Sequence, residues 1–540
     1  MRGFFAANQN KLTFLDSNFD AIYDSSAMTA LFKYKNWLKS HLPEIKKEYF
    51  EFLRFRSISA DPAYKKEMAA CAEWLKNYIA EKTDLKAELI PTDGYPLVYA
   101  ESKFVPKAKT LLIYGHYDVQ PVDPLDLWKS DPFEPVEREG KIFARGAVDD
   151  KGQIFYAIVA ARCWHELVPD HKNFQKNLRP DFSVQQSAES DGNLHQVVER
   201  ERKAGREKMG QIPENFCGRV LGRPLAINLK FCIEGEEESS SRGLAGALPS
   251  LKEKLKADAL VVVDFDQFDE KTPALSMGAR GLVALEATII GSNSDLHSGL
   301  YGGAAYNPNR ALSELIAKFW DKDGRIAVEG FYDDVAEMKE ADLKQFAFSL
   351  DEERVAKEFG IRSYGKEKGR FLGEAVSARP TLEINGLSGG YAGAGIKTVI
   401  PARANVKITC RLVPNQDPKK IGRLVAEFME KNTPSGMKIE ITQHGGEKAF
   451  RARPDSVIAK AVAQASTEVM GKKTVNTLSG GSIPIIAALL KTIQAEMVGM
   501  GYGLPTDNIH APNEHFSMDR FEKGFLTLAR AFELYSGIDI

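Results

Sequence analysis

The 540-residue chain has few cysteines and no long apolar run. Its five cysteines are scattered, odd in number and without a C-x-x-C pair, which argues against a disulfide framework and for free thiols in a reducing compartment. No uninterrupted apolar stretch reaches the length that crosses a membrane, and the apolar patch near residue 5 is too short for the core of a signal peptide. We therefore expect a cytoplasmic protein.

The chain also lacks an excess of charge of either sign. Its 72 Lys and Arg residues face 74 Asp and Glu residues, for a formal net charge of −2. A nucleic-acid or membrane-surface partner usually requires a basic surplus, so we predict neither partner. Internal repeats are absent too, and the length exceeds what one hydrophobic core fills, which indicates two domains or more.

Helix and strand patterns alternate in the first half of the chain. Apolar residues at helical spacing predict helices, and short apolar runs predict strands. Strands that are apolar throughout and separated by helices are typical of an α/β domain with a mainly parallel sheet. The helices are predicted at 36–55, 67–82 and 152–167, and the strands at 110–115, 227–235 and 258–264.

From residue 279 the pattern changes to strand-helix-strand-strand-helix-strand, which is the ferredoxin-like order. Its elements are predicted at 281–291, 307–320, 379–386, 405–413, 417–432 and 437–443. The α/β character then returns at 455–471, 482–494, 495–501 and 520–537. The smaller module is thus predicted to be inserted into one catalytic domain. The expected boundaries are 30–278 and 446–540 for the catalytic domain and 279–445 for the insertion.

A polar segment over 163–222 interrupts the first part of this catalytic domain. It contains the charge run 199–208 and is far longer than the usual connection between a helix and a strand. We interpret it as a surface excursion rather than an added functional element.

The stretch "LLIYGHYDVQP" (111–121) is a predicted strand that ends in His116 and Asp118. An isolated pair of this kind is more often a surface histidine oriented by the aspartate. It can also be a metal ligand with the carboxylate that fixes its tautomer. Further ligand residues at the other strand ends of the chain would favour the metal ligand over the surface histidine.

Those strand ends carry further acidic side chains. In an open α/β sheet the carboxyl ends of parallel strands share one edge, where ligands bind. Two histidines and three carboxylates, one of them shared, would coordinate two divalent ions. The residues that could converge at this edge are His116, Asp118, Asp149, Glu237, Glu238 and Asp264, joined by His510 from the loop 507–516.

Eight motifs in collinear order resemble those of the M20 metallopeptidases, in the branch of cytosolic nonspecific dipeptidase and carnosinase. They are "GHYDVQP", "ARGAVDDKGQ", "EGEEESSS", "ADALVVVD", "DLHSG", "KTVIPARANVKITCRLVP", "GGSIP" and "IHAPNE". The resemblance covers about residue 36 to 540 without the polar segment. It implies a zinc-peptidase-type catalytic domain with an inserted ferredoxin-like lid and dimerisation domain.

The resemblance also implies a role for each residue at the sheet edge. His116 and Asp264 would hold one ion, His510 and Glu238 the other, and Asp149 would bridge both. Asp118 would orient His116, and Glu237 would be the general base. The peptide bond between Asp149 and Asp150 would be cis.

Further residues are implied to act on the substrate. His297 would stabilise the oxyanion in the active site of the neighbouring subunit, so that a homodimer forms through the inserted domain. Thr398, Arg411 and Ser482 would bind substrate. Arg411 can grip a terminal carboxylate with two parallel hydrogen bonds.

We accordingly expect a homodimeric hydrolase of peptide bonds in dipeptides or short peptides that uses two divalent ions. Zn²⁺ is expected first, and Mn²⁺ and Co²⁺ suit the same ligands. Two alternatives stay open: an M20 deacylase or desuccinylase of N-acyl amino acids, and a noncatalytic metal-binding scaffold.

Overall fold

The computed structural model describes residues 25–167, 227–348, 350–481, 483 and 485–536. The predicted polar segment lies outside the described residues from position 168 onwards, and so does Ser482. Before that point, helix α3 (Lys151–Leu167) continues five residues into the segment predicted over 163–222.

The larger of the two main sheets has nine strands and is mixed. Its central strand β3 (Lys109–His116) pairs in parallel with β6 (Ile227–Glu234) and with β7 (Ala259–Val262). The edges are antiparallel, through β1 (Lys86–Ile90) with β2 (Leu97–Glu101) and β8 (Ala274–Ala279) with β15 (Phe450–Arg451). The remaining strands are β17 (Glu496–Met500), next to β7, and β16 (Val475–Ser479), next to β8. The predicted α/β class is thereby confirmed.

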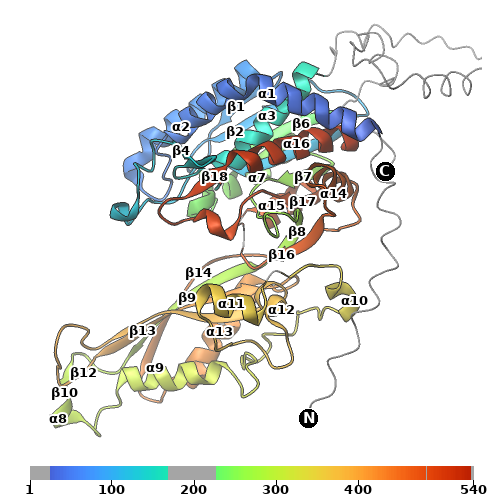
Figure 1. The fold of residues 1–540 in the computed structure, drawn as a ribbon. Helices are drawn as coiled ribbons and strands as arrows, with labels where there is room; N and C mark the ends of the chain where they lie inside the picture. The colour runs from blue at the N-terminus through green and yellow to red at the C-terminus, as the bar shows by residue number, and fades with distance from the viewer. Residues whose placement is uncertain (1–24, 168–226, 349, 482, 484, 537–540) are drawn as a thin grey trace, which may run out of the picture.

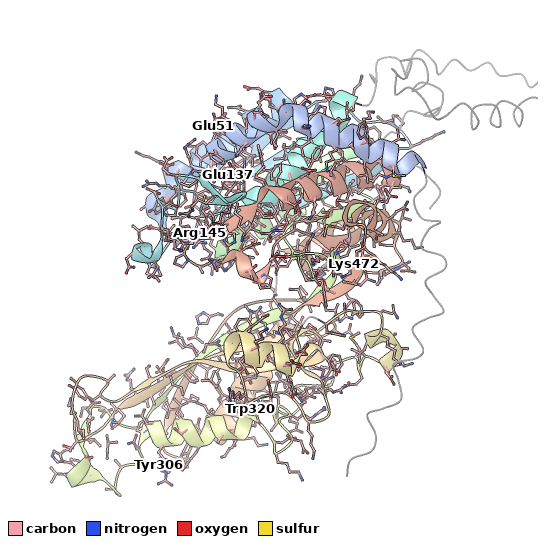
Figure 2. The ribbon with its side chains drawn as sticks, in the orientation of Figure 1. Glu51, Glu137, Arg145, Tyr306, Trp320 and Lys472 are labelled. Carbon is pink, nitrogen blue, oxygen red and sulfur yellow. The ribbon has the colours of Figure 1, made fainter. Side chains whose placement is uncertain are left out.

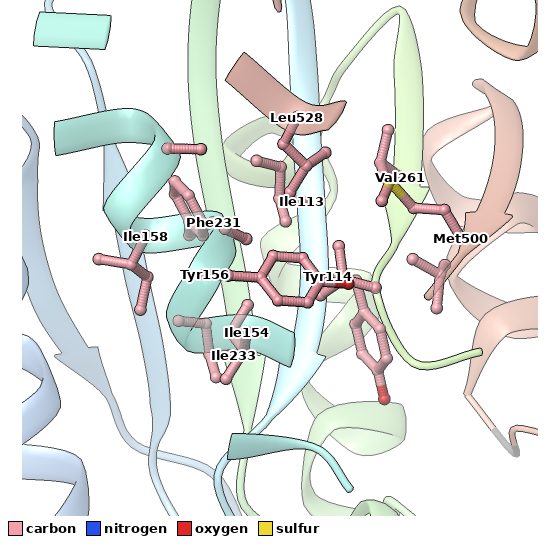
Figure 3. Close-up of a cluster of buried hydrophobic side chains, with 14 of the residues drawn as sticks. Ile113, Tyr114, Ile154, Tyr156, Ile158, Phe231, Ile233, Val261, Met500 and Leu528 are labelled. Atoms are coloured by element: carbon pink, nitrogen blue, oxygen red, sulfur yellow. The ribbon is translucent and has the colours of Figure 1, made fainter. Parts of the chain in front are cut away.

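Helices pack on this sheet because the apolar side chains of the helices and of the sheet are buried against each other. Helix α3 is buried from Lys151 to Trp164 and contacts β3. Figure 3 shows Tyr156 of this helix beside Ile113 and Phe231 of the central strands. Helix α3 contacts α1 (Ser25–Leu53) and α16 (Met518–Tyr535), and α14 (Val457–Met470) packs against α16. Helix α2 (Lys65–Lys82) covers β1 and β2. Helix α7 (Arg242–Leu255) packs on α15 (Ile486–Ile493).

The second main sheet is antiparallel and has the strand order β11-β13-β9-β14. Its strands are β9 (Gly281–Ile290), β11 (Thr381–Gly389), β13 (Arg403–Leu412) and β14 (Lys438–Glu447). Helices α9 (Pro308–Ile316) and α13 (Pro418–Asn432) cover one face and enclose a separate hydrophobic core. This is the predicted ferredoxin-like arrangement. We call residues 281–447 the small unit and the other described residues the large unit.

The chain crosses between the two units at two neighbouring points (Figure 1). Strand β8 runs into β9 through Arg280 alone, and β14 returns to β15 through residues 448–449. Between α9 and β11 the small unit carries short helices that were not predicted from the sequence. They are α10 (Glu340–Leu343), α11 (Glu352–Phe359) and α12 (Leu372–Ser377).

Two small sheets complete the described structure. Strands β4 (Val136–Arg138), β5 (Lys141–Phe143) and β18 (His515–Ser517) bring the C-terminal part of the chain to the loop before α3. At the far end of the small unit, β10 (Leu296–His297) pairs with β12 (Val399–Ile400), followed by α8 (Ser298–Tyr301). None of the described helices combines the length and the apolar character needed to cross a membrane.

Candidate metal centre

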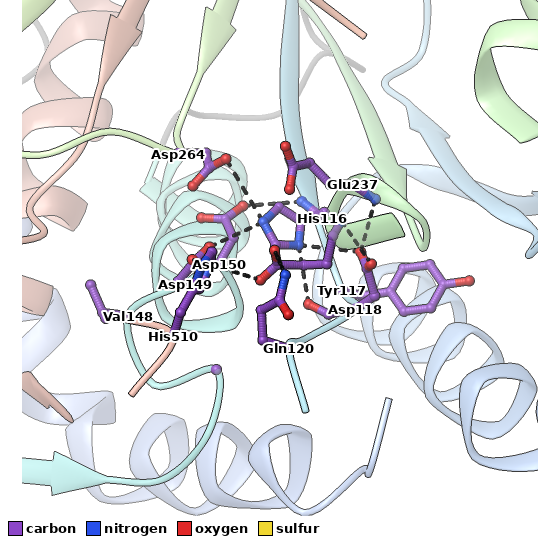
Figure 4. Close-up of polar contacts among 12 residues, drawn as sticks. His116, Tyr117, Asp118, Gln120, Val148, Asp149, Asp150, Glu237, Asp264 and His510 are labelled. Atoms are coloured by element: carbon purple, nitrogen blue, oxygen red, sulfur yellow. Dashed lines mark hydrogen bonds and ion pairs between the residues drawn. The ribbon is translucent and has the colours of Figure 1, made fainter. Parts of the chain in front are cut away.

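The carboxyl edge of the large sheet gathers the acidic and histidine side chains that the sequence placed at strand ends (Figure 4). His116 is the last residue of β3, and Asp264 lies two residues after β7. Glu237 and Glu238 form a 3₁₀ turn after β6. Asp149 lies just before α3, where the peptide bond to Asp150 is cis, as the resemblance implies.

Two groups of ligand atoms share Asp149. In the first, His116 Nε2 lies 3.2 Å from Asp149 Oδ1 and 3.7 Å from Asp264 Oδ2. In the second, His510 Nε2 lies 2.9 Å from Asp149 Oδ2 and 3.2 Å from Glu238 Oε1. The ligand atoms of each group lie within 4.8 Å of one another. We call them the His116 group and the His510 group. One carboxylate therefore turns a different oxygen to each histidine.

The electrostatics of the two groups suit cations. Burial raises the pKa of Asp264 and of Glu237, and the neighbouring carboxylates raise both further. The hydrogen bond to Asp149 and the neighbouring carboxylate of Glu238 raise the pKa of His510 to about 10. Glu238 Oε1 is buried and accepts no well-directed hydrogen bond. So many carboxylates at one buried edge need positive charge, and a donor set of imidazole and carboxylate suits two divalent metal ions.

Asp118 is fully buried and contacts more of the site than the sequence predicted. Its Oδ1 lies 3.3 Å from His116 Nδ1, and its backbone carbonyl oxygen lies 3.1 Å from the same nitrogen. Its carboxylate also accepts hydrogen bonds from the backbone N–H groups of Glu237 at 3.3 Å and Glu238 at 3.1 Å. Ser59 Oγ donates to it at 2.6 Å. Asp118 thus positions one histidine and the turn that carries both glutamates, whereas nothing in the sequence pointed to Ser59.

Glu514 connects the loop that carries His510 with the loop that carries Asp149. Its buried carboxylate accepts hydrogen bonds from Arg145 Nη1 at 2.7 Å and from the backbone N–H groups of Gly146 and Val148, each at 3.0 Å. A fourth comes from the N–H of Asp149 at 3.2 Å. Glu514 is the last residue of the motif "IHAPNE", and no role was predicted for it.

Gln120 holds the other side of the site. Its Nε2 donates to Glu238 Oε2 at 2.8 Å, so that Oε1 of the same carboxylate turns to His510. Gln120 belongs to the motif "GHYDVQP", and no role was predicted for it. Its polar side chain so soon after His116 was the feature of the sequence that could have indicated a place in the site.

Among the described residues, His297, Thr398 and Arg411 lie on the small unit and belong to neither ligand group of this chain. His297 and Thr398 lie at the far end of the small unit, beside β10 and β12 (Figure 1). There His297 is exposed, and its Nδ1 accepts a hydrogen bond from the N–H of Gly299 at 3.0 Å. Arg411 lies at the opposite end of β13, near the crossing between the units. Ser482 lies outside the described residues.

Comparisons with known proteins give matches to parts of both units. A family model described as "Peptidase family M20/M25/M40" matches residues 112–175, and one described as "Peptidase dimerisation domain" matches residues 277–437. The Cys-Gly metallodipeptidase dug1 of Schizosaccharomyces pombe is 28% identical over 87% of this chain and 90% of its own. The human Beta-Ala-His dipeptidase is 26% identical over 88% and 86%.

Solved structures extend the likeness to the whole architecture. The M20 family metallo-carboxypeptidase Sso-CP2 from Sulfolobus solfataricus superposes with a TM-score of 0.72 at 30% identity, covering 91% of this chain and 99% of that one. The di-peptidase Dug1p from Saccharomyces cerevisiae superposes with a TM-score of 0.68 at 24% identity, covering 95% and 98%. At that lower identity the second likeness concerns the fold alone.

Proposed function

The chain belongs to the M20 family of metallopeptidases, and from that premise we propose that it hydrolyses the peptide bond of dipeptides or short peptides. The observation that carries the proposal is Asp149, whose two carboxylate oxygens face His116 and His510. A carboxylate shared in this way is what a pair of metal ions in a hydrolase requires. The names of the dipeptidase relatives support the substrate class.

The His116 group would hold one divalent ion and the His510 group the other. When bound, such a pair polarises the scissile carbonyl and lowers the pKa of a water molecule toward neutrality. We propose Zn²⁺ as the natural metal. Mn²⁺ and Co²⁺ suit the same donors, so the supply in the cell would decide between them.

Glu237 is the proposed general base. It belongs to neither ligand group, and its backbone is held by Asp118. Its carboxylate would accept the proton of the attacking water and then donate it to the nitrogen of the leaving amine. The intact carboxylate at this position also argues against a noncatalytic scaffold.

We further propose a homodimer in which the small unit, within the predicted lid and dimerisation domain 279–445, completes the site of the partner. The far end of the small unit, beside His297, exposes large apolar side chains, including Tyr306 (Figure 2). An exposed cluster of this kind marks an interaction surface. The members of this cluster are Leu300, Tyr301, Tyr306, Tyr391 and Ile396, with exposed fractions of 74%, 47%, 41%, 50% and 95%.

The dimer would give each predicted substrate residue its role. His297 would donate a hydrogen bond to the oxyanion that forms from the substrate carbonyl. Thr398 lies one residue before β12, which pairs with the strand that carries His297, and would bind the substrate beside it. Ser482 and Arg411 would bind the rest of the peptide, with Arg411 on its terminal carboxylate.

A cytoplasmic location is proposed from the cysteines. Cys71, Cys163, Cys232 and Cys410 are buried and form no disulfide among the described residues. Burial raises the pKa of the Cys71 thiol to about 11, so this side chain stays protonated and unreactive. Unreactive free thiols suit a reducing compartment.

Hydrolysis of a substrate panel by the purified, metal-reconstituted protein tests the proposal. The panel contains dipeptides, tripeptides and N-acyl amino acids, and Glu237→Gln is the control for contaminating peptidases. We expect wild-type protein to cleave dipeptides fastest and the control to be inactive. Faster cleavage of N-acyl amino acids would identify a deacylase instead. No cleavage by metal-loaded protein would favour a scaffold.

A further inference from the structure

Arg280 is the single residue between the last strand of one unit and the first strand of the other. Its backbone N–H donates to the carbonyl oxygen of Gly481 at 3.2 Å, and its side-chain Nε donates to that of Gly480 at 2.9 Å. Its Nη1 donates to the carbonyl oxygen of Arg379, just before β11, at 3.2 Å. Arg280 therefore ties a loop of the large unit to the small unit.

The strand register brings Arg280 next to Arg411. In the β9–β13 ladder, Arg411 lies opposite Leu282, two residues after Arg280. Leu282 and Arg411 are half-buried, while the alternate residues of the two strands face the core. Arg280 lies directly before β9, and its charge interacts with that of Arg411, so the two arginines are neighbours at this end of the small sheet. Burial and the charge of Arg411 lower the pKa of Arg280 to about 10.

The acids near this pair leave the charge of Arg280 without a contacting partner. Glu383 on β11 and Glu447 on β14 interact electrostatically with Arg280 and Arg411 respectively, and burial raises the pKa of both carboxyls. Within the described part of the chain, Arg280 makes no ion pair, and its hydrogen bonds all go to backbone carbonyl oxygens. Two half-buried guanidinium groups side by side favour the binding of an anion next to them.

We propose that Arg280 is a positioning residue that makes the enzyme select peptides with a free C-terminal carboxylate. It holds the Gly480–Gly481 backbone against the strand that carries Arg411, and its charge adds to that of Arg411 where the carboxylate binds. The inference rests on the proposed peptidase function and on the carboxylate-binding role of Arg411. It explains why Arg280, which forms no ion pair with any described residue, lies at the crossing between the units.

The test compares one dipeptide with the same dipeptide carrying a C-terminal amide. For Arg280→Met in the metal-loaded enzyme, kcat/KM for the free acid should fall about 10–100-fold, mostly through KM, since one charge-assisted contact to the substrate is weakened. The amide should change less than about two-fold, because it has no charge for Arg280 to attract. If amide turnover is too slow to follow, its inhibition constant against the free acid is measured instead.

Two further variants separate this role from a structural one. Arg280→Lys keeps the charge and should restore part of the preference for the acid. Arg451→Met is the matched control, because Arg451 on β15 is another arginine near the crossing but contacts Met338 and Phe346. It should leave the ratio of acid to amide unchanged.

The results that would overturn the proposal are distinct. An equal loss for acid and amide in Arg280→Met, or a wild-type enzyme that treats them alike, would reduce Arg280 to a structural role. A wild-type enzyme that cleaves and binds neither would refute the proposed function, and this inference with it.

Discussion

Replacing Glu514 by glutamine should weaken the binding of both metal ions at once. The carboxylate has two oxygens, each of which accepts two hydrogen bonds. An amide has only one acceptor oxygen, so its NH₂ group must face either Arg145 and Gly146 or Val148 and Asp149. In both orientations, two buried donors lose their acceptor and the buried Arg145 loses its counter-charge.

The size of the effect follows from these contacts. Removing one partner of a buried ion pair costs about 3–5 kcal/mol, out of the roughly 5–15 kcal/mol by which a typical domain is stable. For the metals, losing a group that orients a ligand costs about 10–100-fold in affinity. Because Asp149 belongs to both the His116 group and the His510 group, we expect the two dissociation constants to rise together.

Competition with a chromogenic chelator measures both dissociation constants, after circular dichroism and gel filtration have shown that the variant is folded. Gln120→Ala is the matched control, since Gln120 holds only Glu238 and should weaken one ion alone. The reasoning is wrong if folded Glu514→Gln binds both ions like wild type, or if it weakens only one of them.

The remaining predictions concern the proposed ligands, the base and the partner subunit. Glu237→Gln should keep both metals yet lose nearly all dipeptide hydrolysis, because an amide cannot accept the proton of water; a near wild-type rate would remove Glu237 from this role. His116→Ala and His510→Ala should each lower metal content and activity together, and two full equivalents by elemental analysis in either variant would contradict the assignment. His297→Ala should keep the metals and the dimer but lower turnover about 10²–10³-fold, the usual loss for one oxyanion donor. Mixing His297→Ala with Glu237→Gln should restore about one quarter of wild-type activity, because half of the dimers are mixed and each mixed dimer has one intact site. No recovery after verified subunit exchange would place His297 in the site of its own chain or outside catalysis.

The long periodic elements could be predicted from the sequence because their own side chains define them. Helix α3 and strands β3 and β6 are apolar almost throughout, and α13 has a polar and an apolar face. The six elements predicted for the small unit are likewise present in the predicted order, as their alternating periods indicate.

Short elements were missed because their stability comes from contacts rather than from local pattern. Strands β4, β5 and β18 have three residues each, and they exist only because the chain near residue 516 returns to the loop near residue 142. Strand β8 is buried from end to end but contains small residues, and no strand was predicted there.

The same distinction holds at the candidate site. The five predicted metal ligands lie at strand ends or in a polar loop, so sheet topology alone suffices to bring most of them together. Ser59 and Glu514 form hydrogen bonds with partners that are 59 and at least 365 residues away in the sequence. No pattern in a single sequence encodes such a pairing. No role was predicted for Arg280, because a single arginine between two strands forms no recognisable sequence motif.

The two neighbouring crossings between the units bear on how this protein could change in evolution. Ala279 lies opposite Phe450 in the large sheet, so one short linker could join β8 to β15 and remove the small unit as a single cassette. All five proposed metal ligands lie outside that cassette, whereas His297, Thr398 and Arg411 lie inside it. The proposed metal ligands and three of the proposed substrate residues are thus encoded on separable stretches of the gene, while Arg280 and Ser482 lie outside the cassette. A new preference for substrate can arise by exchanging or reshaping the cassette while the metal chemistry is inherited intact.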